Sequence, residues 1–172
     1  MSITTSLDLT PLAHLPAHAV LRVVPIEGGA PPDKAKALLA VLDALLAQWR
    51  EDGKIRRGAA CLAAGDCLLL VAYELSGGDL SGCTKDQLTH TLLDYEGVMG
   101  RRMLSAPRMA VERPDGAVDF LTQPEFRERR AAGAIDEASV VFDHLVATLG
   151  EARDGKLRTT VGASWYAPVG AR

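Results

Sequence analysis

The sequence predicts an α+β protein with a mainly antiparallel sheet and helices on one face of that sheet. The first observation is the order of local patterns over residues 19–113, which is strand, helix, strand, strand, helix, strand. The second is the turn signal Ala64-Gly65-Asp66 between two extended runs, and the third is the unbroken apolar run from Leu68 to Ala72, typical of a central strand. The order is that of a ferredoxin-like βαββαβ unit, and another α+β sandwich with the same element order stays open.

The elements of this segment follow from apolar spacing and from turn residues. Pro31-Pro32-Asp33 opens a first helix, in which apolar residues recur every three or four positions as far as Trp49, and Gly53 ends it. The same spacing predicts a second helix over residues 84–98. Extended patterns cover residues 19–26, 55–63, 67–75 and 107–113.

Residues 114–172 predict a C-terminal β-α-β extension of this core. Pro114-Asp115-Gly116 forms a turn before a strand over residues 117–121, and Thr122-Gln123-Pro124-Glu125 is a capping box that starts a short helix ending near Ala132. Residues 139–149 fit a helix or a strand, and we favour a short strand over 139–142. A last extended segment covers residues 157–166. The domain thus spans residues 19–172, and residues 1–18 predict a poorly ordered arm.

Composition limits the classes of function. The chain has 172 residues, enough for one compact domain, and its net charge of −3 favours neither nucleic acid nor a membrane as a partner. The first 21 residues contain no lysine or arginine, so a signal peptide is not predicted. Three cysteines are too few for a disulfide-stapled secreted domain. These observations favour a cytoplasmic protein.

The loop of residues 76–86, with the sequence SGGDLSGCTKD, carries the strongest functional signal. Gly77 and Gly82 have the glycine spacing of a phosphate-binding Walker A loop, and Thr84 stands at its hydroxyl position. The position of the phosphate-binding lysine holds Cys83, and no later apolar strand ends in an aspartate suited to hold magnesium. ATP hydrolysis is therefore not predicted.

Three other interpretations of this loop stay open. In the first, the loop is structural: Ser81 or Thr84 caps the helix, Gly82 allows a tight turn, Cys83 packs as a small apolar residue, and Thr84 forms a capping box with Gln87. In the second, glycine amides at a helix start bind a phosphate or carboxylate. In the third, Cys83 is a reactive thiol. The candidate ligand-binding residues are Gly77, Gly78, Ser81, Gly82, Cys83, Thr84 and Asp86.

The remaining chemistry-bearing residues predict no further site. Cys61 and Cys67 lie on the two arms of a predicted hairpin, but no additional ligands stand at metal-binding spacing, so they are interpreted as buried thiols. His144 beside Asp143 is the only distant histidine suited to act as a base for Cys83. The pair Arg101-Arg102 is interpreted as solvated surface. No metal or cofactor is predicted.

From Gln48 to its end, the chain resembles a family of small bacterial proteins often labelled "ABC transporter ATPase". The resemblance rests on Ser81-Gly82-Cys83-Thr84 with Asp86, and on Trp49, Gly53, Glu74, Leu145-Val146, Thr148 and Ser164-Trp165. Tyr73 departs from the family pattern, which has an acidic residue before Glu74. The resemblance implies a fold and a set of positions, but no established activity.

Together, these patterns favour a non-enzymatic binding or accessory protein. Its expected ligand is a partner protein or a small anion at the loop of residues 76–86, and the alternative is a thiol-dependent enzyme or redox sensor that uses Cys83. A homodimer stays open.

Overall fold

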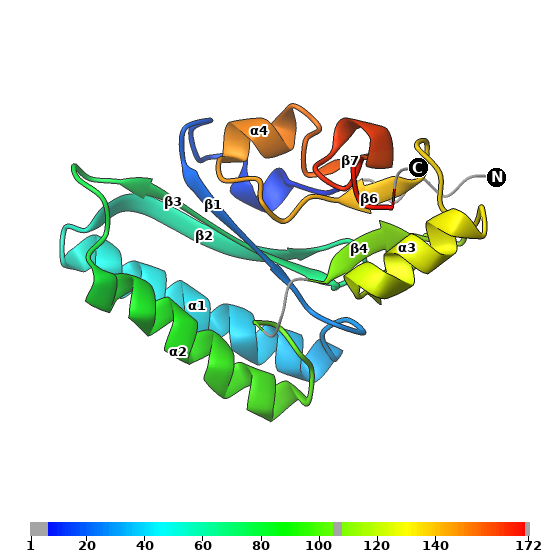
Figure 1. The fold of residues 1–172 in the computed structure, drawn as a ribbon. Coiled ribbons are helices and arrows are strands. Elements are labelled where there is room, and N and C mark those ends of the chain that lie inside the picture. Colours follow the sequence, from blue (N-terminus) through cyan, green and yellow to red (C-terminus); the bar gives the residue numbers. More distant parts are fainter. Residues whose placement is uncertain (1–6, 105–107, 171–172) are drawn as a thin grey trace.

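The computed structural model describes residues 7–104 and 108–170, and within them the chain forms an α+β fold with two antiparallel sheets. The first sheet contains β1 (Val20–Pro25), β2 (Ile55–Ala63) and β3 (Leu68–Leu75) in the order β1-β3-β2. Helices α1 (Pro32–Glu51) and α2 (Gly82–Met99) cover one face of it (Figure 1). The predicted elements of this half are confirmed, including the hairpin between β2 and β3.

Burial explains why β3 is the central strand. Its residues from Leu68 to Tyr73 are at most 2% exposed, because α1 and α2 cover one face of the sheet and the second half of the chain covers the other. Leu69, Val71 and Tyr73 pack toward the helices, whereas alternate residues pack toward the opposite side. A continuous apolar run therefore belongs to a strand that is buried on both faces.

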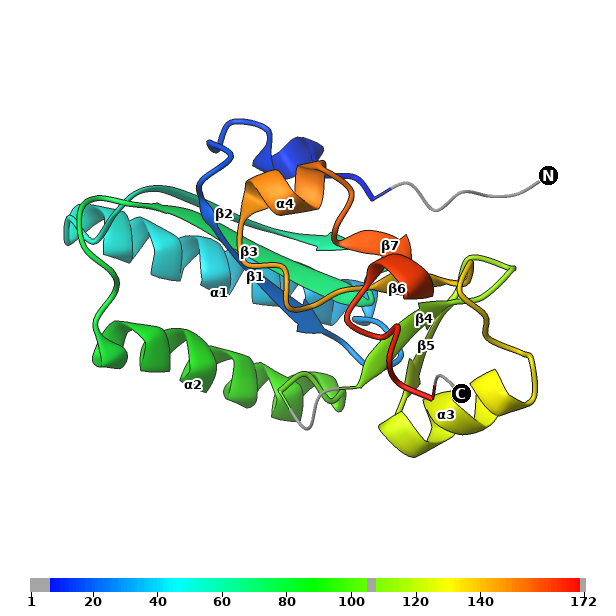
Figure 2. The ribbon, with the colours of Figure 1, turned by 45° about the horizontal axis from the view of Figure 1, so that its top comes forward.

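The fourth strand of the predicted ferredoxin-like unit does not join this sheet. Instead, β4 (Met109–Glu112) pairs with β5 (Val118–Leu121) and β6 (Val140–Phe142), and β7 (Arg158–Thr160) completes a second sheet of order β5-β4-β6-β7 (Figure 2). Pairing depends on long-range packing: Met109, Ala110 and Val111 are all buried, which requires apolar cover on both faces of β4. The last strand of the predicted unit over residues 19–113, β4, therefore belongs to the second sheet, together with the strands of the predicted C-terminal extension.

Part of the outer edge of β1 is covered by the chain between β6 and α4 (Leu149–Arg153). The amide of Leu21 donates to the carbonyl of Ala147 over 2.9 Å, and the amide of Leu149 donates to the carbonyl of Ala19 over 3.0 Å. These bonds occupy the beginning of the edge where a fourth strand would pair in a ferredoxin-like sheet. The rest of the edge, from Val23 to Pro25, has no strand partner among the described residues.

The N-terminal segment corrects the prediction of a poorly ordered arm. Residues 1–6 of that arm lie outside the described residues, but Thr10–Leu12 form a 3-10 helix, and Leu12 and Leu15 are almost fully buried. One guanidinium nitrogen of Arg153, in α4, donates to the carbonyls of Leu12 and Leu15, both over 3.0 Å. This segment packs on the face of the first sheet opposite α1 and α2 (Figure 1).

The C-terminal half confirms most local signals and corrects the last one. Helix α3 (Gln123–Ala131) begins with the predicted capping box of Thr122 and Glu125, and the strand favoured at 139–142 is β6. The predicted extended segment 157–166 ends early: after β7 the chain forms a 3-10 helix at Val161–Ala163 and then turns. These turns bury Tyr166, whose hydroxyl donates to the carbonyl of Phe142 over 3.0 Å. The predicted strand position 107 lies outside the described residues.

Candidate functional site

The loop of residues 76–86 connects β3 to α2 and opens onto solvent. Ser81 is the residue that caps α2: its hydroxyl accepts the amide of Thr84 over 3.3 Å. A hollow of about 460 Å³ lies beside the loop. It is lined by Gly53 and Lys54 on one side, and by residues 76–81 and Thr84 of the loop on the other. The amide of Ser76 donates to the carbonyl of Lys54, so the start of β2 and the loop form one wall.

Backbone donors are the main chemical feature of this loop. The amides of six residues have no acceptor within the part of the chain that the structure describes, and these residues are Gly77, Gly78, Asp79, Ser81, Gly82 and Cys83. Four of them line the hollow: Gly77, Gly78, Asp79 and Ser81. Exposed N–H groups close to a helix start are the donors that bind anions in proteins.

The three loop glycines are not required by the fold. Gly77, Gly78 and Gly82 have no positive φ, and a Cβ atom added at any of them meets nothing within 4 Å. The tight turn predicted at Gly82 is therefore not the reason for a glycine there. The lack of side chains instead leaves the backbone at these positions open to approach from outside.

Charged side chains around the loop largely neutralise one another. Lys85 donates to Asp79 over 2.6 Å, and the amide of Leu80 donates to the same carboxylate over 2.8 Å. The hydrogen bond from Lys85 holds the pKa of Asp79 below its usual range. Lys54 pairs with Asp52 over 2.9 Å but has three donors, so it can also serve a ligand in the hollow. Asp86 is exposed.

Two details of the structural interpretation of the loop are wrong. Cys83 is exposed, so it does not pack as a small apolar residue. Gln87 does not complete a capping box, because its amide oxygen accepts the indole N–H of Trp49 over 2.9 Å. Thr84 is buried and its hydroxyl lies 2.9 Å from that of Ser81.

The thiol interpretation finds no base beside Cys83. Among residues 7–104 and 108–170, no hydrogen bond joins a histidine to Cys83, and His144 instead packs edge-on against Trp165 with ring centroids 5.9 Å apart. Burial lowers the pKa of His144, which keeps its imidazole neutral at neutral pH. Burial also raises the pKa of Cys61 to about 11 and raises that of Cys67, as is typical of unreactive thiols.

Glu74, one of the residues on which the family resemblance rests, is the centre of an ion-pair cluster. Its carboxylate is nearly buried and accepts from Arg57 over 2.9 Å, while Arg56 and His18 lie 3.7 Å and 3.6 Å away. A register shift between Ile55 and Arg57 is a β-bulge, which brings two consecutive arginines to one carboxylate. The hydrogen bond from Arg57 lowers the pKa of Glu74. The cluster is satisfied internally and therefore stabilises the sheet end.

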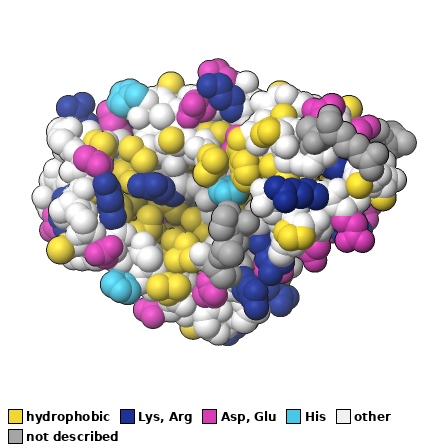
Figure 3. All heavy atoms as spheres, in the orientation of Figure 1, with side chains coloured by type: hydrophobic (Ala, Val, Ile, Leu, Met, Phe, Trp, Pro, Cys, Tyr) yellow, Lys and Arg dark blue, Asp and Glu magenta, His cyan; other side chains and the backbone are white. Residues whose placement is uncertain are grey.

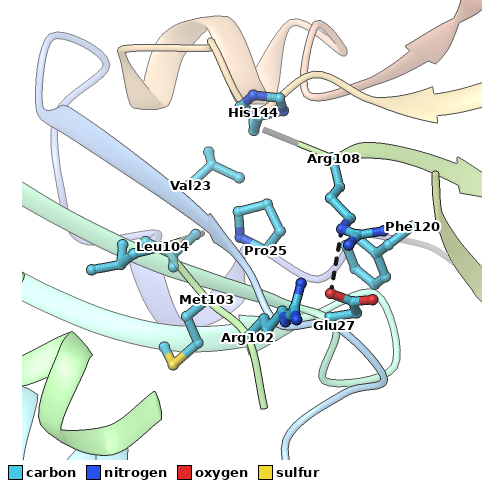
Figure 4. Close-up of a pocket in the computed structure, with 10 residues that line it drawn as sticks. Val23, Pro25, Glu27, Arg102, Met103, Leu104, Arg108, Phe120 and His144 are labelled. Atoms are coloured by element: carbon cyan, nitrogen blue, oxygen red, sulfur yellow. Dashed lines mark ion pairs between the residues drawn. The ribbon is translucent and has the colours of Figure 1, made fainter. Parts of the chain in front are cut away.

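A second concave site was not predicted from the sequence. It lies between β1, the segment after α2, Phe120 of β5 and His144, and it has a volume of about 230 Å³ (Figure 4). Figure 3 shows that this face is hollowed beside β1 and that hydrophobic side chains form the floor. The basic pair Arg101-Arg102 was its only sequence signal, and the tertiary structure separates that pair: Arg101 donates to the carbonyl of Gly29, whereas Arg102 lines the pocket.

Metal and membrane sites find no support in the described part of the chain. No group of three or more His, Cys, Asp or Glu side chains is placed to hold a metal ion in residues 7–104 and 108–170. None of the helices described there combines the length and the apolar character needed to cross a bilayer.

The fold and the loop define an α+β protein with an open, donor-rich helix entrance. Comparisons of the chain with protein-family models, with curated proteins and with solved structures found no match.

Proposed function

We propose that this protein is a non-enzymatic binding protein that holds a small anionic ligand at the loop of residues 76–86. The observation that carries the proposal is that Gly77, Gly78 and Gly82 are required neither by backbone conformation nor by packing. Bare backbone is useful where an external group must approach N–H donors closely, as phosphate and carboxylate groups do. Lys54, on the wall of the hollow, adds a positive charge.

Phosphoryl transfer is a poor alternative for this loop. Lys85, the nearest lysine on the helix side of the loop, is paired with Asp79 and follows Thr84 rather than preceding it. The strand before the loop, β3, is central in an antiparallel sheet, whereas a Walker A loop follows a strand of a βαβ unit. The resemblance to the bacterial family labelled "ABC transporter ATPase" therefore supports the position of a site and not ATP hydrolysis.

Replacement of the two consecutive loop glycines tests the anion site. Because an added Cβ meets no neighbour, Gly77→Ala and Gly78→Ala should each stabilise the fold by about 0.4–1 kcal/mol through the unfolded chain. The double variant should at the same time bind inorganic phosphate about tenfold more weakly, since methyl groups obstruct the amides. Isothermal calorimetry with phosphate and thermal unfolding measure the two effects separately.

Substitution of Asp79 tests the same site in the opposite direction, because it should strengthen phosphate binding. Asp79→Asn removes a negative charge from the hollow and releases Lys85, so phosphate should bind several-fold more tightly. Asp94→Asn, at an exposed position of α2, makes the same change in net charge and should leave phosphate binding unchanged. Wild-type affinity in the double glycine variant, or absence of saturable phosphate binding, would reject the proposal.

A thiol-dependent enzyme or redox sensor is the second candidate, because Cys83 is the one exposed cysteine of the chain. For this function Cys83 must react with iodoacetamide faster than a model thiol at neutral pH. Cys61 and Cys67 are internal references, since burial raises the pKa of both thiols and should make their alkylation slow. A Cys83 rate equal to that of the model thiol, with Cys83→Ser as the blank, rules this candidate out.

A further inference from the structure

The pocket beside β1 exists because the sheet edge is left open. The amide of Leu21 points outward to Ala147, and alternate residues of a strand point to the same side, so the amide of Val23 faces the open edge. Pro25 follows with no amide N–H to donate. The uncovered edge is thus too short to pair with another strand, but it provides one backbone donor within a concave surface.

The pocket combines an apolar body with cations on one side. Six of its ten lining residues are apolar, and they include Pro25, Met103 and Phe120. Figure 4 shows the side chain of Arg108 reaching toward the carboxylate of Glu27, and Arg102 comes from the segment after α2. The Nε atom of Arg108 lies 3.5 Å from Glu27, a long ion pair, and the side chain of Arg102 has no partner among the described residues.

Charge balance selects the ligand. Among the lining residues, Arg102 and Arg108 supply two positive charges and Glu27 supplies one negative charge, while burial lowers the pKa of the half-buried His144 imidazole. The lining residues therefore leave one positive charge in excess, which suits a singly charged carboxylate better than a doubly charged phosphate. A guanidinium group can hold a carboxylate through two parallel hydrogen bonds.

The volume limits the size of that ligand. About 230 Å³ is below the roughly 300–1,000 Å³ of sites that hold drug-sized molecules, so the pocket suits a short acid with a single ring or a branched chain. We propose that this pocket binds a small monocarboxylic acid, with its carboxylate between Arg102 and Arg108 and its apolar body against Pro25, Met103 and Phe120. This site is separate from the loop of residues 76–86.

Benzoate and 3-methylbutanoate are suitable probes, measured by calorimetry with the full chain. Both acids should bind saturably, whereas the neutral analogue benzamide should bind at least tenfold more weakly. Arg102→Gln should weaken benzoate binding about tenfold without a change in melting temperature, because Arg102 is exposed and its side chain makes no hydrogen bond or ion pair with the described residues. Glu27→Gln removes the competing carboxylate and should tighten binding several-fold.

Two further variants locate the site. Arg50→Gln removes an exposed arginine at the end of α1 and should leave benzoate affinity unchanged. Val23→Phe fills the pocket and should abolish binding. The proposal is overturned if benzamide binds as well as benzoate, if Arg50→Gln weakens binding as much as Arg102→Gln, or if neither acid binds at millimolar concentration.

Discussion

Replacement of Trp49 by alanine is expected to lower the free energy of unfolding by about 3–5 kcal/mol, the usual range for deletion of a buried aromatic side chain. Trp49 lies in the last turn of α1 and is fully buried. Its ring packs edge-to-face on Tyr73 of β3 at 5.8 Å between centroids, and its indole N–H donates to Gln87 of α2. One side chain therefore joins both helices to the sheet, and its removal leaves a cavity among all three.

Urea unfolding followed by circular dichroism measures this loss. Trp49→Phe should cost less than Trp49→Ala, because it keeps an aromatic ring against Tyr73 and loses the bond to Gln87. Gln87→Ala should cost about 1 kcal/mol, since it leaves the indole N–H without its acceptor. A loss below about 1 kcal/mol for Trp49→Ala would contradict the packing of α1 against α2 and β3 described above.

Leu12→Ala is expected to lower the free energy of unfolding by about 2–5 kcal/mol, because the Leu12 side chain is 0% exposed beneath the second half of the chain. An N-terminal arm of low order would instead make the same substitution nearly silent. The measurement therefore separates the predicted arm from the packed segment that the structure contains.

Leu93→Ala is the matched control for this experiment. Leu93 lies on α2 with 48% of its surface exposed, so the same chemical change there should alter stability by no more than about 0.5 kcal/mol. Equal effects of the two substitutions in urea unfolding would show that the N-terminal segment is not part of the folded core.

Local sequence signals predicted the structure correctly where the residues that determine an element lie close together in the chain. The hairpin turn at residues 64–66, the capping box at Thr122 and the apolar spacing of α1 depend on residues close together in the chain, and all three are confirmed. The N-terminal segment lacked such a signal: proline and threonine surround Leu12 and Leu15, and only contact with α4 and the sheet buries them.

The candidate site was predictable only in part. The glycine spacing located the loop of residues 76–86, and its glycines predicted accessible backbone N–H donors there. That Ser81 is the cap, that Lys85 is paired with Asp79 and that Cys83 faces solvent depend on side-chain orientation and burial, which the sequence does not contain. The pocket beside β1 had no motif, because its residues come from four separate segments.

By itself, the sequence determined the order and approximate bounds of the strands and helices from β1 to β6, because apolar periodicity, caps and turn residues act over a few positions. Only the tertiary structure decided which strands share a sheet. Apolar side chains lie on both faces of β4, and both faces are buried where β4 pairs with β5 and β6. The edge of β1 that β4 leaves unpaired forms part of the pocket. Strand pairing depends on contacts between residues far apart in the chain, which local sequence patterns do not contain.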